Sequence, residues 1–132
     1  MKTYHGSCHC GAVRFEADID LSGGTIRCNC SICAKLRLWN VIVQAESFRL
    51  LSGAADLSQY LFNTKTDRHF FCKHCGVHPF GTGNSPRWGT FYGLNVSCLD
   101  DVGVDELVNA PIDYLDGRND NWLTPPAEVR HL

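Results

Sequence analysis

Seven of the eight cysteines fall in three short motifs, and this spacing constrains the chain more than any other feature. In chain order, the cysteines of the three motifs are Cys8 and Cys10, then Cys28, Cys30 and Cys33, then Cys72 and Cys75. Cysteines so close in sequence are poorly placed for disulfides between distant segments, whereas short spacings let two sulfurs reach one metal ion. The pattern therefore predicts metal-bound thiolates rather than disulfides.

The first and third motifs share a glycine, because Gly11 follows Cys10 and Gly76 follows Cys75. Glycine adopts positive φ at low cost, so the backbone can curl there and point N–H groups at the sulfurs. Four sulfurs close a tetrahedral zinc site, the arrangement typical of structural zinc. We expect this site to consist of Cys8, Cys10, Cys72 and Cys75. Its halves are about 60 residues apart, against roughly 15 to 20 in a zinc ribbon, so it would join distant strands.

The middle motif supplies only three sulfurs, from Cys28, Cys30 and Cys33. Three protein ligands and an open fourth position are typical of catalytic zinc. Ser31 is placed to begin a short helix whose unpaired N–H groups would lower thiol pKa values. Two alternatives remain: a fourth ligand from Cys98 or a histidine, which would make this zinc structural, or a redox thiol cluster without a second metal. Cys98 is otherwise expected to be a small buried core residue.

Hydrophobic patterning predicts a mainly β fold with minimal helix. Apolar and charged residues alternate over 13–20, as in a half-buried strand. Further strands are expected at 39–45, 47–51, 57–64, 68–72, 89–99 and 110–116. The pair 57–64 and 68–72 reads as a hairpin that closes near 65–67, and residues 81–89 read as a connecting loop. Short helices are expected at 31–38 and within 101–109, and residues 123–132 as an extended tail.

Length and charge narrow the class of protein. The chain has 132 residues, 44% of them hydrophobic, which suits one domain spanning 1–132. A net charge of -2 without a basic stripe argues against a nucleic-acid partner. We find no apolar run near the roughly 20 residues that span a bilayer and no secretory signal, so we expect a cytoplasmic protein without membrane contact. A reducing cytoplasm sustains metal-bound thiolates better than disulfides.

Five segments in order, GSCHCGAVRFE, CNCSIC, FFCKHCGVHPF, LNVSCLDD and DYLDGRN, resemble the glutathione-dependent formaldehyde-activating enzyme family, which includes centromere-protein-V-like proteins. The resemblance runs from about Ser7 to Asn119. It implies a β-tent-like domain of several short antiparallel sheets stapled by two zinc ions, with a motif-bearing core at about 4–122. By this resemblance the structural site matches Cys8, Cys10, Cys72 and Cys75, and the catalytic site matches Cys28, Cys30 and Cys33.

The resemblance also implies a carbon–sulfur lyase type of reaction, in which glutathione and formaldehyde combine to S-hydroxymethylglutathione. Our mechanistic hypothesis is that a small thiol such as glutathione takes the open position on the Cys28, Cys30 and Cys33 zinc, ionises, and attacks a small aldehyde. The alternative is a non-catalytic zinc module that binds thiol adducts or a protein partner.

Further polar residues lie beside the third cysteine motif or follow an expected strand. His69 and His78 flank the third motif and are candidates for proton transfer, with ordinary strand or turn packing as the alternative. Asp116, Arg118 and Asn119 follow an expected strand, where side-chain to backbone hydrogen bonds of a turn account for them. We therefore expect no functional role for the last three.

Overall fold

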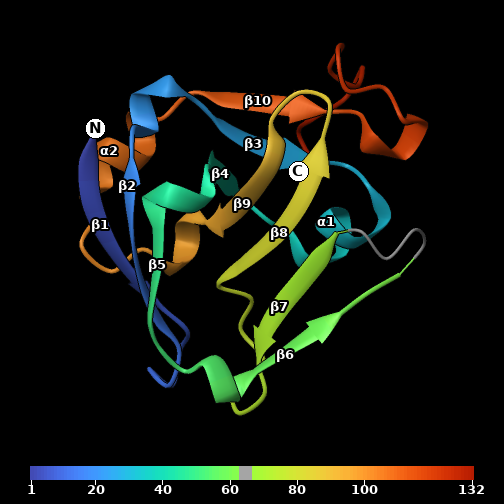
Figure 1. Ribbon diagram of the computed structural model, residues 1–132. Coiled ribbons are helices and arrows are strands. Elements are labelled where there is room, and N and C mark those ends of the chain that lie inside the picture. Colours follow the sequence, from blue (N-terminus) through green and yellow to red (C-terminus); the bar gives the residue numbers. More distant parts are fainter. Residues whose placement is uncertain (63–66) are drawn as a thin grey trace.

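The computed structural model describes residues 1–62 and 67–132 and shows two β-sheets with short helices at their margins (Figure 1). The first sheet is antiparallel and has the order β1 (Lys2–Ser7), β2 (Arg14–Ile19) and β5 (Phe48–Ser52). The alternation seen over 13–20 is confirmed, since Phe15, Ala17 and Ile19 are buried. Strand β1 was not predicted.

The second sheet has seven strands in the described part of the chain. In spatial order they are β10 (Ile112–Leu115), β3 (Thr25–Cys28), β4 (Asn40–Val43), β9 (Gly89–Asn95), β8 (Phe80–Ser85), β7 (Arg68–Cys72) and β6 (Leu57–Tyr60). Adjacent strands in this sheet are antiparallel, except that β10 and β3 run parallel, with Leu115 opposite Cys28. This parallel pair brings the chain that leaves β10 beside the cysteine motif that leaves β3.

Aromatic rings fill the space between the sheets. The ring of Phe48, from the first sheet, lies with its centroid 4.8 Å from that of Phe80 and 4.5 Å from that of Tyr92, both from the second. Phe15 is fully buried and lies 5.6 Å from Phe48. Offset and tilted aromatic contacts of this kind add to the free energy gained by burying apolar area. The fold is therefore mainly β, with two open sheets packed on one aromatic core.

Both α-helices found in residues 1–62 and 67–132 are short. Helix α1 (Ser31–Leu36) is two residues shorter than predicted, because Arg37 takes the left-handed conformation and ends it. Cys30, and not Ser31, occupies the N-cap position. Helix α2 (Val104–Asn109) confirms the second predicted helix. Short 3-10 turns occur at Leu21–Gly23, Ala45–Ser47, Ala54–Asp56, Val96–Cys98 and Gly117–Asn119.

Some strand predictions were wrong in detail. Strand β3 was missed, and the loop predicted at 81–89 contains most of β8. Glycine makes β8 possible, because a Cβ at Gly83 would lie 2.7 Å from the ring of Phe91 on the neighbouring strand. The strand predicted at 89–99 ends at Asn95, whose side chain accepts a hydrogen bond from Ser97 N–H and starts a turn.

The hairpin predicted from 57–72 is confirmed as the β6 and β7 pair, while its closure at 65–67 falls mostly outside the described residues. Residues 123–132 contain bends and a turn from Leu132 N–H to Val129 O, 3.0 Å apart. In the parts of the chain that the structure describes, neither helix approaches the length and apolar character needed to cross a bilayer.

Candidate metal centres

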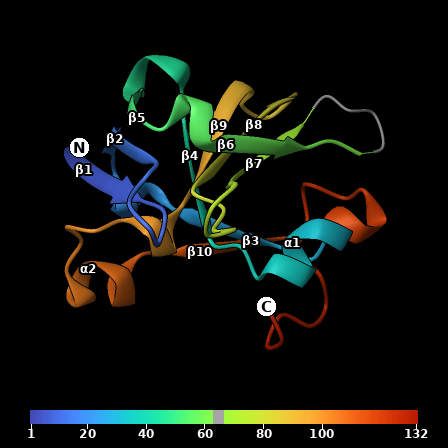
Figure 2. The same ribbon diagram turned by 90° about the horizontal axis from the view of Figure 1, so that it is seen from below.

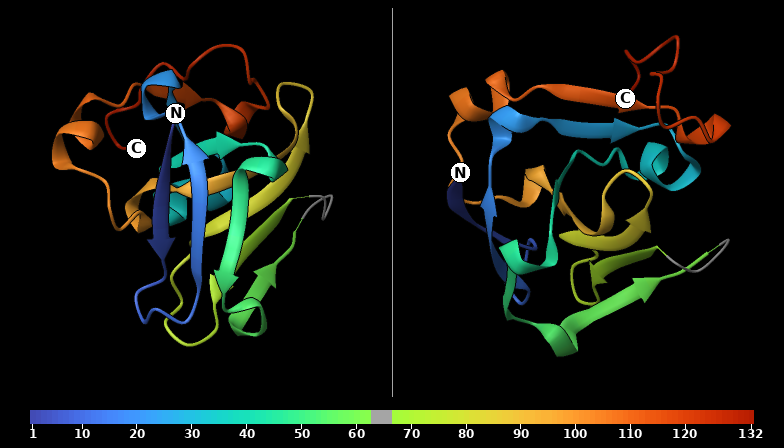
Figure 3. Two further views of the ribbon diagram at one scale, coloured as in Figure 1. Left: turned by 60° about the vertical axis from the view of Figure 1, so that its left-hand side comes forward. Right: turned by 45° about the horizontal axis from the view of Figure 1, so that its top comes forward.

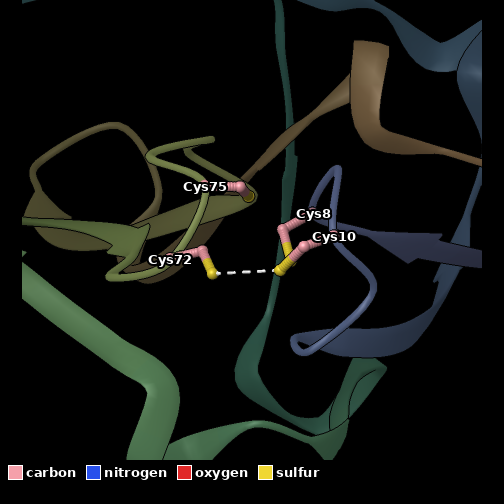
Figure 4. Close-up of side chains that lie close together, drawn as sticks. All are labelled: Cys8, Cys10, Cys72 and Cys75. Carbon is pink, nitrogen blue, oxygen red and sulfur yellow. Dashed lines mark hydrogen bonds between the residues drawn. The ribbon is translucent and has the colours of Figure 1, made fainter.

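Four cysteines from two distant loops converge between the sheets (Figure 4). Cys8 and Cys10 lie in the turn between β1 and β2, and Cys72 and Cys75 lie at the end of β7 and in the turn after it. All four sulfurs are within 4.8 Å of one another. Cys10 Sγ is 3.7 Å from Cys8 Sγ and 3.6 Å from Cys72 Sγ. Tetrahedral zinc with bonds of about 2.3 Å separates its sulfurs by about 3.8 Å, so the cluster fits such an ion.

The backbone of both turns is shaped as the glycines predicted. Gly11 has φ +81° and Gly76 has φ +78°. The two turns also repeat one hydrogen bond, since Gly11 N–H donates to Cys8 O at 3.2 Å and Gly76 N–H to Cys72 O at 2.8 Å. The curl points N–H groups at sulfur: Val13 N–H donates to Cys8 Sγ at 3.3 Å. Such donors stabilise thiolates.

Burial and charge in this cluster also suit a cation. Cys8 and Cys72 are buried, at 3% and 0% exposed. The N–H groups of Cys10 and Val77 lower the pKa of Cys75 to about 6, so that its thiolate is favoured at neutral pH. At Cys10 the N–H of Ala12 also favours the thiolate, but desolvation and the neighbouring thiols outweigh it and raise the pKa to about 11. A bound cation would favour the thiolate of Cys10 and lower this pKa.

The three remaining motif cysteines also meet. Cys28 ends β3, Cys30 is the N-cap of α1, and Cys33 lies inside that helix. Their sulfurs are all within 4.8 Å of one another, and Cys30 N–H donates to Cys28 Sγ at 3.4 Å. Cys28 is buried, whereas the other two are partly exposed. We call these three residues the cysteine triad; its donor set can hold a metal ion with one side accessible.

Hydrogen bonds shift the thiol pKa values of Cys30 and Cys33 in opposite directions. Contacts with the thiols of Cys28 and Cys33, and then the N–H groups of Cys33 and Ile32, lower the pKa of Cys30 to about 2. The same contacts between thiols raise the pKa of Cys33. Thiolate character is therefore centred on Cys30, at the N-cap, where the sequence predicted that N–H groups of the helix would lower a thiol pKa.

No fourth side chain joins the triad among residues 1–62 and 67–132, since no histidine, carboxylate or further thiol meets the same 4.8 Å criterion. Cys98 is buried in the turn after β9, where its S–H donates to His78 O at 3.8 Å. Burial raises the pKa of Cys98 to about 12, and the cysteines whose charge acts on it are Cys8 and Cys75. Cys98 is therefore a core residue near the four-cysteine cluster.

His69 and His78 are both half-buried. Burial lowers the pKa of each ring, so both are neutral at pH 7. The charges of Asp67 and Cys30 act on His69 in the opposite direction, which places this ring within electrostatic range of the triad. The His69 ring also stacks on Phe62 with centroids 5.6 Å apart. A role in proton transfer stays a prediction for both histidines.

Sequence reasoning missed the segment after β10. Asn29, which separates Cys28 from Cys30, donates from Nδ2 to Asp116 Oδ1 at 2.8 Å. Its Oδ1 accepts from Arg118 N–H at 2.9 Å. Asn29 and Asp116 are both only 8% exposed. The turn predicted at 116–119 is present, as the 3-10 turn Gly117–Asn119, but its contact with Asn29 was not predicted. The available signal was that DYLDGRN is one of the five resembling segments.

Gly117 forms one wall of the triad. A Cβ at this position would lie 2.7 Å from Cys28 Sγ, 3.1 Å from Cys30 Cβ and 2.7 Å from Cη2 of Trp122. The backbone of Gly117 therefore packs closely against both the sulfur of Cys28 and the indole of Trp122, and no side chain fits there. Two views show residues 117–122, in red-orange, beside α1 (Figures 2 and 3).

Comparisons with known proteins agree with this architecture. Residues 3–113 match the family described as glutathione-dependent formaldehyde-activating enzyme. A crystal structure of a Rhodobacter sphaeroides protein, a structural genomics target, superposes with a TM-score of 0.70 at 31% sequence identity. The match covers 83% of this chain and 99% of that one. On this evidence the chain belongs to the glutathione-dependent formaldehyde-activating enzyme family.

Proposed function

We propose that this protein catalyses the addition of a small thiol, glutathione or a similar compound, to formaldehyde or another small aldehyde at the cysteine triad. In this proposal both clusters bind zinc: the four-cysteine cluster is structural and the triad is catalytic. The observation that carries the proposal is the difference between them. One cluster has four sulfurs on turns that tie two sheets together, whereas the other has three, one side accessible, in a chain of this family.

The reaction forms a bond between the thiol sulfur and the aldehyde carbon. The π electron pair of the C=O bond moves to oxygen, and the proton of the S–H group ends on that oxygen, so neither oxidant nor reductant is needed. A zinc ion held by the triad would supply Lewis acidity and favour the ionised form of the thiol. In the protein, Gly117 and Trp122 bound one side of the site, and N–H groups at the start of α1 favour negative charge on sulfur.

The proton needs an acceptor near the triad. His69 is the candidate, because burial keeps its ring neutral and the charge of Cys30 reaches it. A neutral imidazole can accept a proton and return it. A His69→Gln variant that binds thiol normally but loses rate would fit this role.

Two measurements test the proposal together. Native mass spectrometry counts zinc in protein purified without added metal, and ¹³C NMR exchange measures how fast ¹³C-formaldehyde passes between its free and glutathione-bound forms. The second measurement separates catalysis from the spontaneous reaction, which is run without protein. We expect two zinc ions and faster exchange for the unmodified protein, and one zinc ion with the spontaneous rate for Cys30→Ser.

Full zinc content and full activity in Cys30→Ser would contradict the proposal. Two zinc ions with thiol binding but only the spontaneous exchange rate would instead identify a non-catalytic module. One zinc ion, with a reversible disulfide among Cys28, Cys30 and Cys33, would identify a redox cluster.

A further inference from the structure

Arg118 is held at the triad by two hydrogen bonds to one residue. Its backbone N–H donates to Asn29 Oδ1 at 2.9 Å, and its side-chain Nε donates to Asn29 O at 3.2 Å. Asn29 lies between Cys28 and Cys30, and its own side chain is buried against Asp116. Hydrogen bonds therefore hold Arg118 at its backbone N–H and at Nε of its guanidinium group. Both lie next to the residues that would bind the catalytic zinc.

Arg118 is not neutralised by an ion pair among the residues that the structure describes, although its charge contributes to the lowered pKa of Asp116. No ion pair there includes Arg118, although its side chain is exposed. Asp116 and Asp120 each lie two residues from Arg118 in sequence. The oxygens of Asp116 accept hydrogen bonds from Asn119 and Asn29, which lower its pKa, and Asp120 Oδ1 accepts one from Trp122 Nε1 at 2.8 Å. Arg118 is exposed, and among the described residues its side chain donates only from Nε, to Asn29 O.

A guanidinium fixed in this way is suited to bind a carboxylate. Two parallel N–H donors match the two oxygens of a carboxylate, and fixing the side chain in advance reduces the entropy lost on binding. Gly117 and Trp122 also restrict how a ligand can reach Cys28, because both lie close to its sulfur or to the adjoining backbone. An anionic group of a ligand whose sulfur lies at the triad would meet Arg118.

We propose that Arg118 binds a carboxylate of the thiol substrate, so that the site selects thiols that carry a carboxylate, such as cysteine-containing peptides, over neutral thiols. This inference rests on the proposed function for the identity of the ligand. It assigns Arg118 to binding and leaves bond formation to the triad. Small aldehydes carry no anion, so Arg118 discriminates among thiols only.

The test separates the carboxylates from the thiol. Isothermal titration of zinc-loaded protein uses S-methylglutathione, whose thiol is blocked, and glutathione diethyl ester, whose carboxylates are blocked. We expect Arg118→Gln to weaken S-methylglutathione binding about tenfold or more, as a charge-assisted hydrogen bond predicts. Binding of the ester should change less than about twofold. Arg118→Lys keeps the charge without the planar fork and should recover part of the affinity.

Arg87→Gln is the matched control. Arg87 is also exposed, pairs with Asp113 at 3.5 Å, and contacts neither the triad nor Asn29 in the described structure. It should bind S-methylglutathione like the unmodified protein. Zinc content and the thermal unfolding midpoint, measured on each variant, show that a loss of binding is not a loss of folding.

Three results would overturn the inference: no binding of S-methylglutathione to the unmodified protein, equal losses in Arg118→Gln and Arg87→Gln, or no loss in Arg118→Gln. Binding of S-methylglutathione that depends on Arg118, with no acceleration of thiol and aldehyde exchange, would support the carboxylate site. The same result would overturn the proposed reaction. Failure of the carboxylate site and failure of the proposed reaction can therefore be told apart.

Discussion

The backbone of Gly117 lies against the sulfur of Cys28, at a distance that leaves no room for a side chain, since a Cβ there would stand 2.7 Å from Cys28 Sγ. The contact exists because β10 and β3 run parallel and end together, with Leu115 opposite Cys28. The next residues of both strands are then neighbours. Two polar segments 87 residues apart, at Asn29 and Asp116, thus form one site.

Gly117→Ala should disturb the triad without unfolding the protein. The added methyl group meets Cys28 Sγ on one side and Trp122 on the other, and displaced sulfurs bind metal less well. We expect native mass spectrometry to show one metal ion in place of two. Gly23→Ala is the control, because its Cβ would lie an ordinary 3.5 Å from Asp20 Oδ2. Two tightly bound metal ions in Gly117→Ala would show that the backbone at residue 117 moves enough to accommodate the methyl group.

Cys72→Ser should affect folding far more than Cys30→Ser. Cys72 is fully buried and belongs to the cluster that ties β7 to the turn after β1. A structural zinc contributes on the order of 10 kcal/mol to folding, which is comparable with the whole stability of a domain. We expect near-ultraviolet circular dichroism and cooperative thermal unfolding to be lost in Cys72→Ser and kept in Cys30→Ser. Similar melting curves for the two variants would refute the division of roles.

Cys98→Ala should leave the metal content unchanged. Cys98 is a buried core residue, 6% exposed, whose S–H contacts a carbonyl oxygen and lies outside both sulfur clusters. The expected cost is about 1 kcal/mol of unfolding free energy, typical of a small core truncation, measured by urea titration. A drop of one in the zinc count would instead make Cys98 a ligand.

His5 should make stability depend on pH. Its Nδ1 lies 2.9 Å from Asp101 Oδ2 and its Nε2 lies 3.2 Å from Glu16 Oε2. The hydrogen bond with Asp101, and then the charges of Asp101 and Glu16, outweigh desolvation and raise the pKa of His5. Because the folded pKa is raised, this contribution is complete below the unfolded value of about 6.5 and is lost as pH rises through the folded pKa.

The measurement is urea unfolding of zinc-loaded protein at pH 6 and pH 8.5, compared with His5→Gln. The unmodified protein should lose more stability than the variant over this interval, by a modest amount because the ring is exposed. Carboxylates act in the opposite direction: the hydrogen bond from Arg49 lowers the pKa of Glu16, so that contribution is lost only in acid. Equal pH dependence in both proteins would exclude His5 as the cause.

Features with a local cause could be predicted from the sequence. The alternation over 13–20, the turns at Gly11 and Gly76, and the start of α1 near the triad follow from side-chain periodicity and backbone freedom within a few residues. Strand β8 was missed because its glycines carry no strand propensity. They are required there by close neighbours such as Phe91, and these neighbours are known only from the pairing of strands.

Spacing groups seven cysteines into three motifs, and the glycine after Cys10 and after Cys75 indicated that the first and third motifs belong together. The surroundings of the triad do not follow from spacing. The position of Arg118 depends on Asn29, and that contact depends on β10 lying parallel to β3 at the edge of the sheet. Strand order is set by packing of the whole chain, so no local pattern around residue 29 or residue 118 contains it. Local chemistry specified which cysteines group together, and only the tertiary fold decided which residues lie beside them.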